Sequence, residues 1–141
     1  MSSKSVGTEQ IQLSRLSRLG LGTVQFGFDY GVNNARGQVP YDEVCAILTS
    51  ASDQGVNFLD TSRSYGVSES VLGKAIAEIG RDFTICTKLD LPSNFSELSE
   101  NEIGEAVNAS FMGSCKSLQL NTLPMFLLHI FDYKTTHGGY V

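Results

Sequence analysis

The chain lacks tryptophan, has only three prolines, and contains no hydrophobic run close to the ~18 residues that a membrane helix needs. The sequence therefore predicts no membrane-spanning segment. Its first ten residues are polar, which does not match the continuous apolar stretch of a secretory signal. We therefore expect residues 1–10 to be mobile and the protein to be cytoplasmic.

Cysteine is scarce as well, and its spacing argues against two kinds of site. Cys45, Cys86 and Cys115 are odd in number, far apart and set among apolar residues. A disulfide framework needs paired cysteines, so we expect reduced thiols in the core. Zinc ligands are closely spaced, and neither these cysteines nor His129 and His137 have that spacing. The sequence therefore predicts no metal site.

Positive charge is in short supply: ten Lys and Arg residues stand against fifteen Asp and Glu residues, and the formal net charge is −5. No segment clusters Lys and Arg in the way that phosphate binding requires, so we expect no nucleic-acid partner. The remaining composition, 41% hydrophobic and 18% charged over 141 residues, is ordinary for one folded domain.

Short apolar segments alternate with helical patterns along the chain. From Val44 to Ala51, apolar residues recur at the i, i+3, i+4, i+7 spacing of a helix that packs on one face. Further on, Ser99 and Glu102 have the spacing of a capping box. The alternation predicts βαβ units and a parallel sheet. The expected strands are 19–23, 56–60, 83–88 and 125–129, and the expected helices begin near Pro40, Ser68 and Ser99.

Other segments carry more local expectations. Residues 11–18 alternate apolar and polar positions, which is typical of a short strand or hairpin arm. Residues 25–39 are rich in Gly and Asn and predict a long loop. Ser68 is expected to cap the second helix. The solvated face of that helix is expected to carry Glu69, Lys74, Glu78, Arg81 and Asp82.

Four polar residues stand at or just beyond the predicted strand ends: Asp60, Tyr65, Lys88 and His129. A parallel barrel brings its strand ends together at one mouth, so we expect these side chains to share a pocket. Reduction of a carbonyl group needs a proton donor, and a free phenol with a pKa near ~10 is a reluctant one at neutral pH. An ammonium ~4 Å away favours the phenolate by roughly 4 kcal/mol at an effective dielectric of ~20.

This chemistry assigns a role to each side chain. Lys88 would make Tyr65 a usable acid, Asp60 would hold the charge of Lys88 in place, and His129 would orient the substrate oxygen. Each residue taken singly also has a simpler explanation, as a loop cap, a solvent-exposed cation, a cover over the sheet end or a structural histidine. Their joint occurrence at consecutive strand ends favours the catalytic interpretation.

Four motifs connect the chain to a known family. They are LGLGT at 19–23, GVNFLDTSRSYG at 55–66, SESVLG at 68–73 and TK at 87–88. On these motifs, the chain from about residue 16 to residue 129 resembles the aldo-keto reductases. The resemblance implies a (β/α)8 TIM-type barrel and reduction of an aldehyde or ketone by NADPH, with NADH left open. It also implies that Asp60, Tyr65, Lys88 and His129 match the catalytic tetrad of that family.

The resemblance further implies where the cofactor and substrate lie. Gly22, Thr23 and Asp60 match positions beside the nicotinamide, and the partner is a small-molecule carbonyl compound. The glycines of the LGLGT motif have a second explanation of equal weight, because they also permit close packing at one end of a barrel.

The chain is much shorter than such a barrel, which takes ~250 residues and rarely fewer than ~200. We therefore expect residues 1–141 to form a single partial domain, roughly the first four βα units. The family holds most of its cofactor with residues of the second half, so two alternatives to a reductase stay open. One is a non-catalytic nicotinamide-sensing or interaction subunit, and the other is an inert truncated product. Unpaired first and fourth strands would also predict self-association through the exposed barrel edges.

Overall fold

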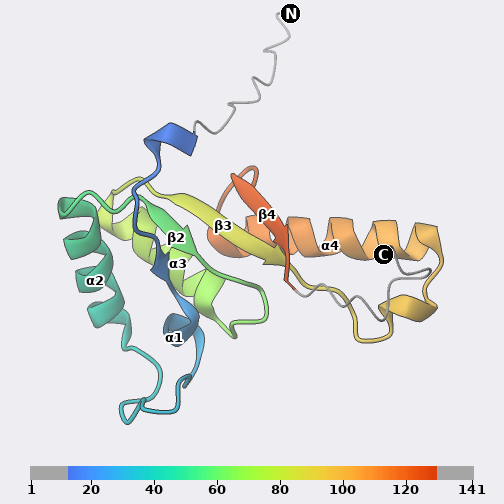
Figure 1. Cartoon of the computed structure of the whole chain (residues 1–141), viewed down its shortest axis with the longest axis horizontal. Helices are drawn as coiled ribbons and strands as arrows, with labels where there is room; N and C mark the ends of the chain where they lie inside the picture. The colour runs from blue at the N-terminus through green and yellow to red at the C-terminus, as the bar shows by residue number, and fades with distance from the viewer. Residues whose placement is uncertain (1–12, 130–141) are drawn as a thin grey trace, which may run out of the picture.

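The computed structural model describes residues 13–129, which form a four-stranded parallel sheet packed against helices (Figure 1). The strands follow chain order, β1-β2-β3-β4, and each neighbouring pair is parallel. This confirms the predicted alternation of parallel strands with helices. The strands are β1 (Leu21–Gly22), β2 (Phe58–Asp60), β3 (Thr84–Leu89) and β4 (Met125–Leu128).

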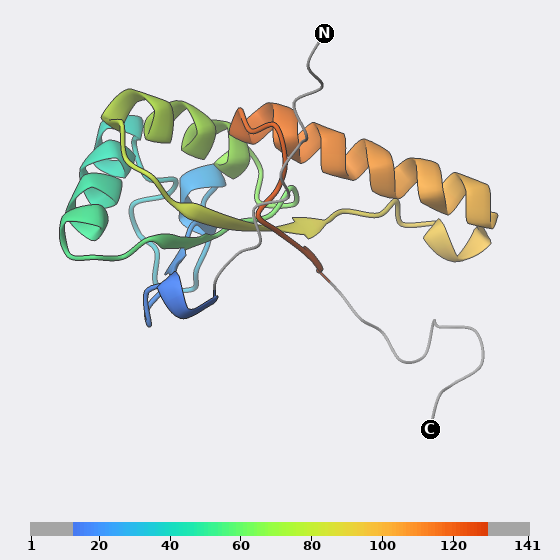
Figure 2. The same ribbon diagram turned by 90° about the horizontal axis from the view of Figure 1, so that it is seen from above.

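The helices lie mainly along one face of this sheet. Figure 2 shows α3 and α4 running above the strands on the same side. The opposite face is the one that would point into a barrel. The helices are α1 (Val24–Gly27), α2 (Tyr41–Asp53), α3 (Ser68–Ile79) and α4 (Glu100–Leu118), with two 3-10 turns, η1 (Leu13–Arg15) and η2 (Phe95–Glu97).

Helix α4 begins at the predicted capping box. The Glu102 backbone N–H donates to the Ser99 hydroxyl oxygen, and the Ser99 backbone N–H donates to the Glu102 carboxylate at 2.8 Å. The Ser99 hydroxyl, which also donates to this carboxylate, and then the Ser99 N–H hold the pKa of Glu102 below its usual value. These reciprocal bonds satisfy N–H groups that a helix end leaves open, which fixes where α4 starts.

Four local expectations are wrong. Strand β1 is shorter than the predicted strand 19–23. The segment 25–39, predicted to be a loop, begins with part of α1, where the Phe26 N–H donates to the Thr23 carbonyl oxygen at 2.9 Å. Residues 13–15 form η1 rather than a strand, while 11 and 12 lie outside the described residues.

The fourth difference concerns how α2 and α3 begin. Pro40 and Val67 precede α2 and α3, and neither supplies a side-chain cap. Ser68 is the first residue of α3 rather than its cap, because its hydroxyl donates to the Thr23 carbonyl oxygen at 2.9 Å instead. A polar contact to a neighbouring strand end therefore replaces the expected cap.

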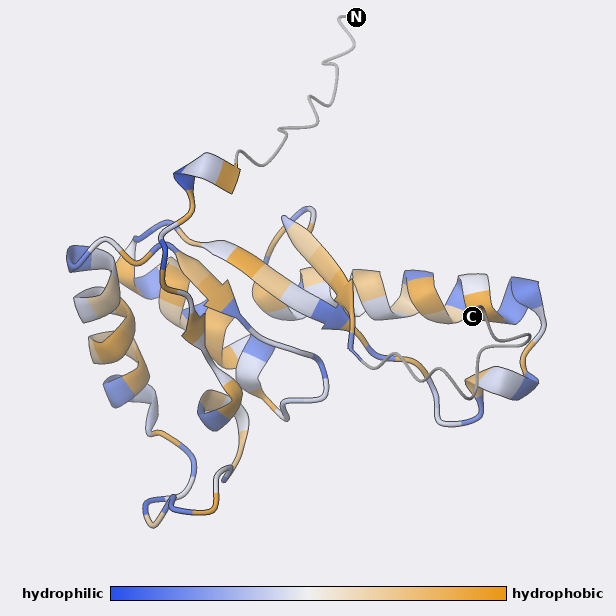
Figure 3. Ribbon diagram, viewed as in Figure 1, coloured by the Kyte–Doolittle hydropathy of each residue, from blue (hydrophilic) through white to orange (hydrophobic). Residues whose placement is uncertain are grey.

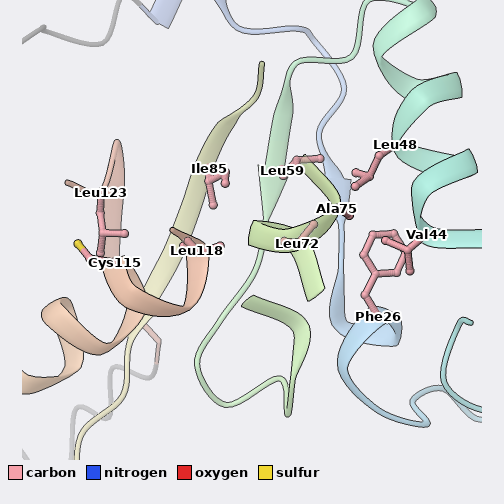
Figure 4. Packing of buried hydrophobic residues seen from close by; sticks show 10 residues of the cluster. All are labelled: Phe26, Val44, Leu48, Leu59, Leu72, Ala75, Ile85, Cys115, Leu118 and Leu123. Atoms are coloured by element: carbon pink, nitrogen blue, oxygen red, sulfur yellow. The ribbon is translucent and has the colours of Figure 1, made fainter. Parts of the chain in front are cut away.

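The hydrophobic core fills the space between the sheet and the helices (Figure 4). Leu59 of β2 and Ile85 of β3 belong to the same cluster as Leu72 of α3. Figure 3 shows hydrophobic residues over most of β2 and β4 and at intervals along the helices. Burying one such side chain contributes about 1.5–3 kcal/mol, so this layer holds the sheet in place. The other buried members are Phe26, Val44, Leu48, Ala75, Cys115, Leu118 and Leu123.

Candidate active site

The strand register places three of the candidate residues on one face of the sheet. Asp60 pairs with Cys86, and Lys88, two residues further along β3, pairs with Leu127. Side chains on a strand alternate between faces, so Asp60 and Lys88 point to the same side. His129 lies two residues beyond Leu127, just after β4 ends. The carboxyl ends of β2, β3 and β4 therefore form one polar rim.

The Lys88 ammonium is held on all of its donor positions. Its Nζ donates to both carboxylate oxygens of Asp60 and to the carbonyl oxygen of Thr61, each at 2.8 Å. An ammonium has three N–H donors, and these three acceptors match them. The Lys88 side chain is 14% exposed and that of Asp60 is 40% exposed, so the pair sits at the solvent boundary. Asp60 and the Thr61 carbonyl thus fix the position of the Lys88 ammonium.

Tyr65 lies between the charged pair and the histidine. The Lys88 Nζ is 5.0 Å from the centroid of the Tyr65 ring, within range of a cation–π attraction. The Tyr65 and His129 rings meet edge to face, with centroids 5.6 Å apart and planes at 81°. The structure therefore brings Asp60, Lys88, Tyr65 and His129 together. Because all three Lys88 donors are occupied, its influence on Tyr65 acts through charge rather than a hydrogen bond.

The turn that carries Tyr65 is fixed by a close approach of backbone to backbone. A Cβ on Gly27, the last residue of α1, would overlap the Tyr65 carbonyl oxygen and lie 2.8 Å from the Ser68 nitrogen. Gly66 has a φ of 56°, a conformation that glycine adopts without strain. The Gly27 carbonyl accepts a hydrogen bond from the Val67 N–H at 3.3 Å. Short helix α1 thus sets the position of Tyr65.

His129 is held by two hydroxyl groups of the same turn. Its Nδ1 lies 3.0 Å from Ser62 Oγ and 3.1 Å from Ser64 Oγ. Ser62 is fully buried, while Ser64 is exposed. The ring therefore has hydrogen-bond partners on its Nδ1 side.

A second polar cluster lies on the opposite, helix-facing side of the same strand ends. The Thr23 hydroxyl donates to the Asp60 carbonyl oxygen at 2.9 Å and lies 3.0 Å from Ser68 Oγ, which in turn is 3.0 Å from Thr61 Oγ1. All three hydroxyl residues are fully buried. This cluster ties β1, β2 and α3 together directly behind the rim.

The prediction that Glu69 lies on the solvated face of its helix is wrong. Its residue exposure is 4%, and its carboxylate accepts a hydrogen bond from Thr87 Oγ1 at 2.7 Å. Arg63 lies 3.7 Å away and supplies the compensating charge. Glu69 precedes Leu72 by three residues and Ile76 by seven, so it belongs to the buried stripe of α3 by the same helical spacing. That spacing was the signal in the sequence for its burial.

The two buried thiols have no acidic role at neutral pH. Burial, with a further contribution from the Asp60 charge, raises the pKa of Cys86. Burial and the charge of Glu69 likewise raise the pKa of Cys115. Both thiols therefore stay protonated and act as small apolar side chains.

The backbone at Gly22 leaves open space beside Asp60. Gly22 pairs with Asp60, and a Cβ added to Gly22 would meet no atom within 4 Å. The predicted neighbour Thr23 is different, because its side chain is fully buried and its hydroxyl is engaged behind the rim. The Gly22 position is therefore open, whereas the Thr23 side chain is enclosed behind the rim.

Several site residues were not identified from the sequence. Ser62 and Ser64 lie 67 and 65 positions from His129, and no local pattern connects them. The Thr61 carbonyl that holds Lys88 is a backbone group, which the residue type does not reveal.

Within residues 13–129, no group of three His, Cys, Asp or Glu side chains is arranged to hold a metal ion. The helices of that same part are all too short or too polar to cross a membrane.

A parallel βα layer with a charged and phenolic rim at its strand ends is the N-terminal part of a TIM-type barrel. Comparison with known proteins gives the family: residues 18–138 match the model of the Aldo/keto reductase family, and the chain belongs to this family. The resemblance and the fold class predicted from the sequence are therefore confirmed. Members of this family are oxidoreductases that typically use a nicotinamide cofactor.

Individual relatives agree with this assignment. The uncharacterized oxidoreductase YrpG of Bacillus subtilis is 30% identical over 138 residues, covering 86% of this chain and 38% of the relative. The aldo-keto reductase YhdN of the same organism is 35% identical over 123 residues, covering 80% and 34%. The structure of a glycerol dehydrogenase from Gluconobacter oxydans matches with a TM-score of 0.62 at 27% identity, covering 84% and 37%. The chain thus spans well under half the length of these relatives.

Proposed function

We propose that these residues form the proton-donating and carbonyl-orienting part of a site that reduces an aldehyde or ketone with NADPH. The observation that carries the proposal is the joint position of four groups on one rim. Lys88 is bound to Asp60 at 2.8 Å and lies over Tyr65, and Tyr65 packs against His129. An acid, a cation that favours its conjugate base and a hydrogen-bond donor are the groups that carbonyl reduction requires.

Each side chain has one task in this proposal. When bound, NADPH supplies the hydride to the carbonyl carbon. Tyr65 gives its hydroxyl proton to the carbonyl oxygen, and His129 donates a hydrogen bond that orients that oxygen. The Lys88 charge, 5.0 Å from the Tyr65 ring, stabilises the phenolate that remains. Asp60 holds Lys88 in place.

The nicotinamide end of the cofactor would lie against Gly22, Asp60 and the Thr23 backbone. The open space at Gly22 supports this position. The same contacts suit NADH, so both cofactors belong in the assay. We also assign the protein to the cytoplasm, where the three free thiols remain reduced.

A second candidate is a non-catalytic subunit that binds a nicotinamide or a protein partner. Strand β4 favours it, because Leu127 and Leu128 are 51% and 61% exposed at the edge of the sheet. An exposed apolar edge strand is a surface for pairing with another chain. A second copy of this chain is the partner that we propose for this edge, and sedimentation of the wild type against Leu127→Lys tests it. A monomeric wild type would contradict self-association.

The proposed reaction is tested by Tyr65→Phe, with Tyr30→Phe as the matched control because Tyr30 is 53% exposed in a loop. Oxidation of NADPH is followed with a panel of aldehydes and ketones, for this chain and for a complete barrel that contains it. Loss of a general acid lowers the rate by about 10²–10⁴-fold, so Tyr65→Phe should fall by this amount and Tyr30→Phe should not.

Calorimetric titration with NADPH separates the alternatives. Unchanged cofactor binding in Tyr65→Phe is expected, because the phenol acts on the substrate oxygen. Saturable binding without turnover in the wild type supports the non-catalytic subunit. Ordinary turnover by Tyr65→Phe would contradict the role of the phenol.

A further inference from the structure

Two serine hydroxyls gather on one nitrogen of His129. Ser62 Oγ and Ser64 Oγ lie 3.0 and 3.1 Å from Nδ1, and the two hydroxyl oxygens are 3.0 Å apart. The Ser64 backbone N–H also donates to Ser62 Oγ at 3.3 Å. Three polar atoms thus form a closed triangle at the edge of the rim.

The number of protons in this triangle favours one arrangement. A hydroxyl can donate one hydrogen bond and accept two. If Ser62 donates to Nδ1 and Ser64 donates to Ser62 Oγ, then Ser62 makes three bonds and both hydroxyl protons are used within the triangle. If Nδ1 carries the hydrogen instead, it donates to Ser62, Ser62 donates to Ser64, and the Ser64 proton has no acceptor in the triangle. The first arrangement makes Nδ1 an acceptor.

The environment of each group fits the first arrangement. Ser62 is fully buried, so its proton must find a partner inside the protein, and Nδ1 and Ser64 Oγ both lie 3.0 Å away. Donation to Nδ1 leaves Ser62 Oγ free to accept from both the hydroxyl and the backbone N–H of Ser64. The Tyr65 ring packs edge to face against the imidazole at 5.6 Å and limits its rotation. The turn that carries both serines is held by the close approach at Gly27.

We propose that Ser62 and Ser64 are positioning residues for His129. Their hydroxyls hold Nδ1 as a hydrogen-bond acceptor, so the neutral ring carries its hydrogen on Nε2. Nε2 is then the nitrogen available to donate to a carbonyl oxygen, and this last step rests on the proposed function. The tautomer is inferred from the triangle and does not depend on the proposed function.

The tautomer can be read from the ¹⁵N NMR signals of the ring. The chain has two histidines, so His137→Gln leaves His129 as the single imidazole. The spectra are recorded on the neutral ring, for which we expect the Nε2–H form to dominate. A dominant Nδ1–H form would overturn the proposal.

Serine variants test whether the hydroxyls cause this preference. In the His137→Gln background, Ser62→Ala combined with Ser64→Ala should give a mixture of tautomers. Ser70→Ala is the matched control, because Ser70 is exposed and its hydroxyl donates to the Val67 carbonyl. An unchanged tautomer ratio in the double variant would overturn the proposal.

The exposed serine keeps the test decisive if removal of the buried hydroxyl unfolds the chain. Ser64→Ala alone removes one donor from the triangle and should shift the tautomer ratio in the same direction, by less than the double variant. Ser64→Thr retains a hydroxyl and should restore the original ratio. Equal ratios in Ser64→Ala, Ser64→Thr and the wild type would contradict a role for Ser64.

Kinetics then separate this inference from the proposed function. The double variant should lower kcat by roughly two- to tenfold with NADPH affinity unchanged, because a mixed population keeps the donor in only part of the molecules. If Tyr65→Phe retains turnover, the proposed function fails while the tautomer result stands. If the tautomer is wrong while Tyr65→Phe is inactive, only the positioning role fails.

Discussion

Two polar clusters built from adjacent residues lie on opposite faces of the same strand ends. Asp60 and Lys88 face the rim, whereas their chain neighbours Thr61 and Thr87 face the helices. The helix-facing groups are fully buried and bonded to Ser68 and Glu69 of α3. The rim groups are partly exposed. The same alternation of a strand thus separates residues that hold the fold together from residues that remain accessible.

The difference indicates what each cluster contributes to stability. A buried hydroxyl whose partner is removed carries its full desolvation cost, about 1–3 kcal/mol. A partly exposed ion pair can exchange its partner for water and contributes about 0–1 kcal/mol. Substitutions behind the rim should therefore lower stability, and substitutions on the rim should leave it nearly unchanged.

The largest effect on stability is expected where the two faces meet, at Gly27. Gly27→Ala places a methyl group against the Tyr65 carbonyl and should lower the free energy of unfolding by about 3 kcal/mol. Gly104→Ala is the matched control. A Cβ there meets nothing within 4 Å in the exposed face of α4, and the change should raise stability by about 0.5–1 kcal/mol. Urea unfolding gives the free energy of unfolding of both variants. Equal changes in the two would contradict the close backbone approach at Gly27.

The next effect is expected in the buried hydroxyl cluster. Ser68→Ala leaves the Thr23 and Thr61 hydroxyls without their shared partner and should cost about 2 kcal/mol. Ser70→Ala removes an exposed hydroxyl from the same helix and should stay within about 0.5 kcal/mol of the wild type. Thermal unfolding of the two variants would contradict the comparison if Ser70→Ala were the more damaging.

A smaller effect is expected on the rim. Asp60→Asn keeps an oxygen that can accept from Lys88, and Thr61 still accepts a second bond. The change should therefore lower the free energy of unfolding by less than about 1 kcal/mol. A loss as large as that of Ser68→Ala, measured by the same unfolding curves, would show that the rim is also structural.

The smallest effect concerns the pH dependence of stability. Burial raises the pKa of Cys86 and Cys115 in the folded chain above the unfolded value of ~8.5. The folded state therefore binds more protons than the unfolded state above that pH, and the free energy of unfolding falls as pH rises. Urea unfolding from pH 8 to 9.5 should show this slope. The variant with Cys86→Ala and Cys115→Ala should show a flatter one, and an equal slope would contradict the assignment.

Much of the fold was predictable because its signals are local. The capping box at Ser99 and the apolar stripe of α2 depend on residues one or two turns apart. Likewise, the strand ends that carry Asp60 and Lys88 follow from short apolar segments. Such signals come from neighbours in sequence, and the structure bears them out.

The rest depends on contacts between distant residues. The Ser68 hydroxyl donates to the Thr23 carbonyl oxygen, 45 positions away, instead of capping its own helix. The His129 ring contacts Ser62 and Ser64, which lie 67 and 65 positions away. Lys88 was expected near the Tyr65 hydroxyl, yet its three donors go to Asp60 and Thr61. No local pattern shows which acceptor a side chain will meet after folding.

The central claim is that Tyr65 and Lys88 act in one proton transfer. A double-mutant cycle on NADPH-dependent reduction tests it most directly, with Tyr65→Phe, Lys88→Met and the combined variant. If Lys88 acts only by supporting the Tyr65 phenolate, its removal costs nothing further once the phenol is gone, and the double variant is as slow as Tyr65→Phe alone. Rate losses that multiply in the double variant would show that the two residues act independently, and would contradict the account.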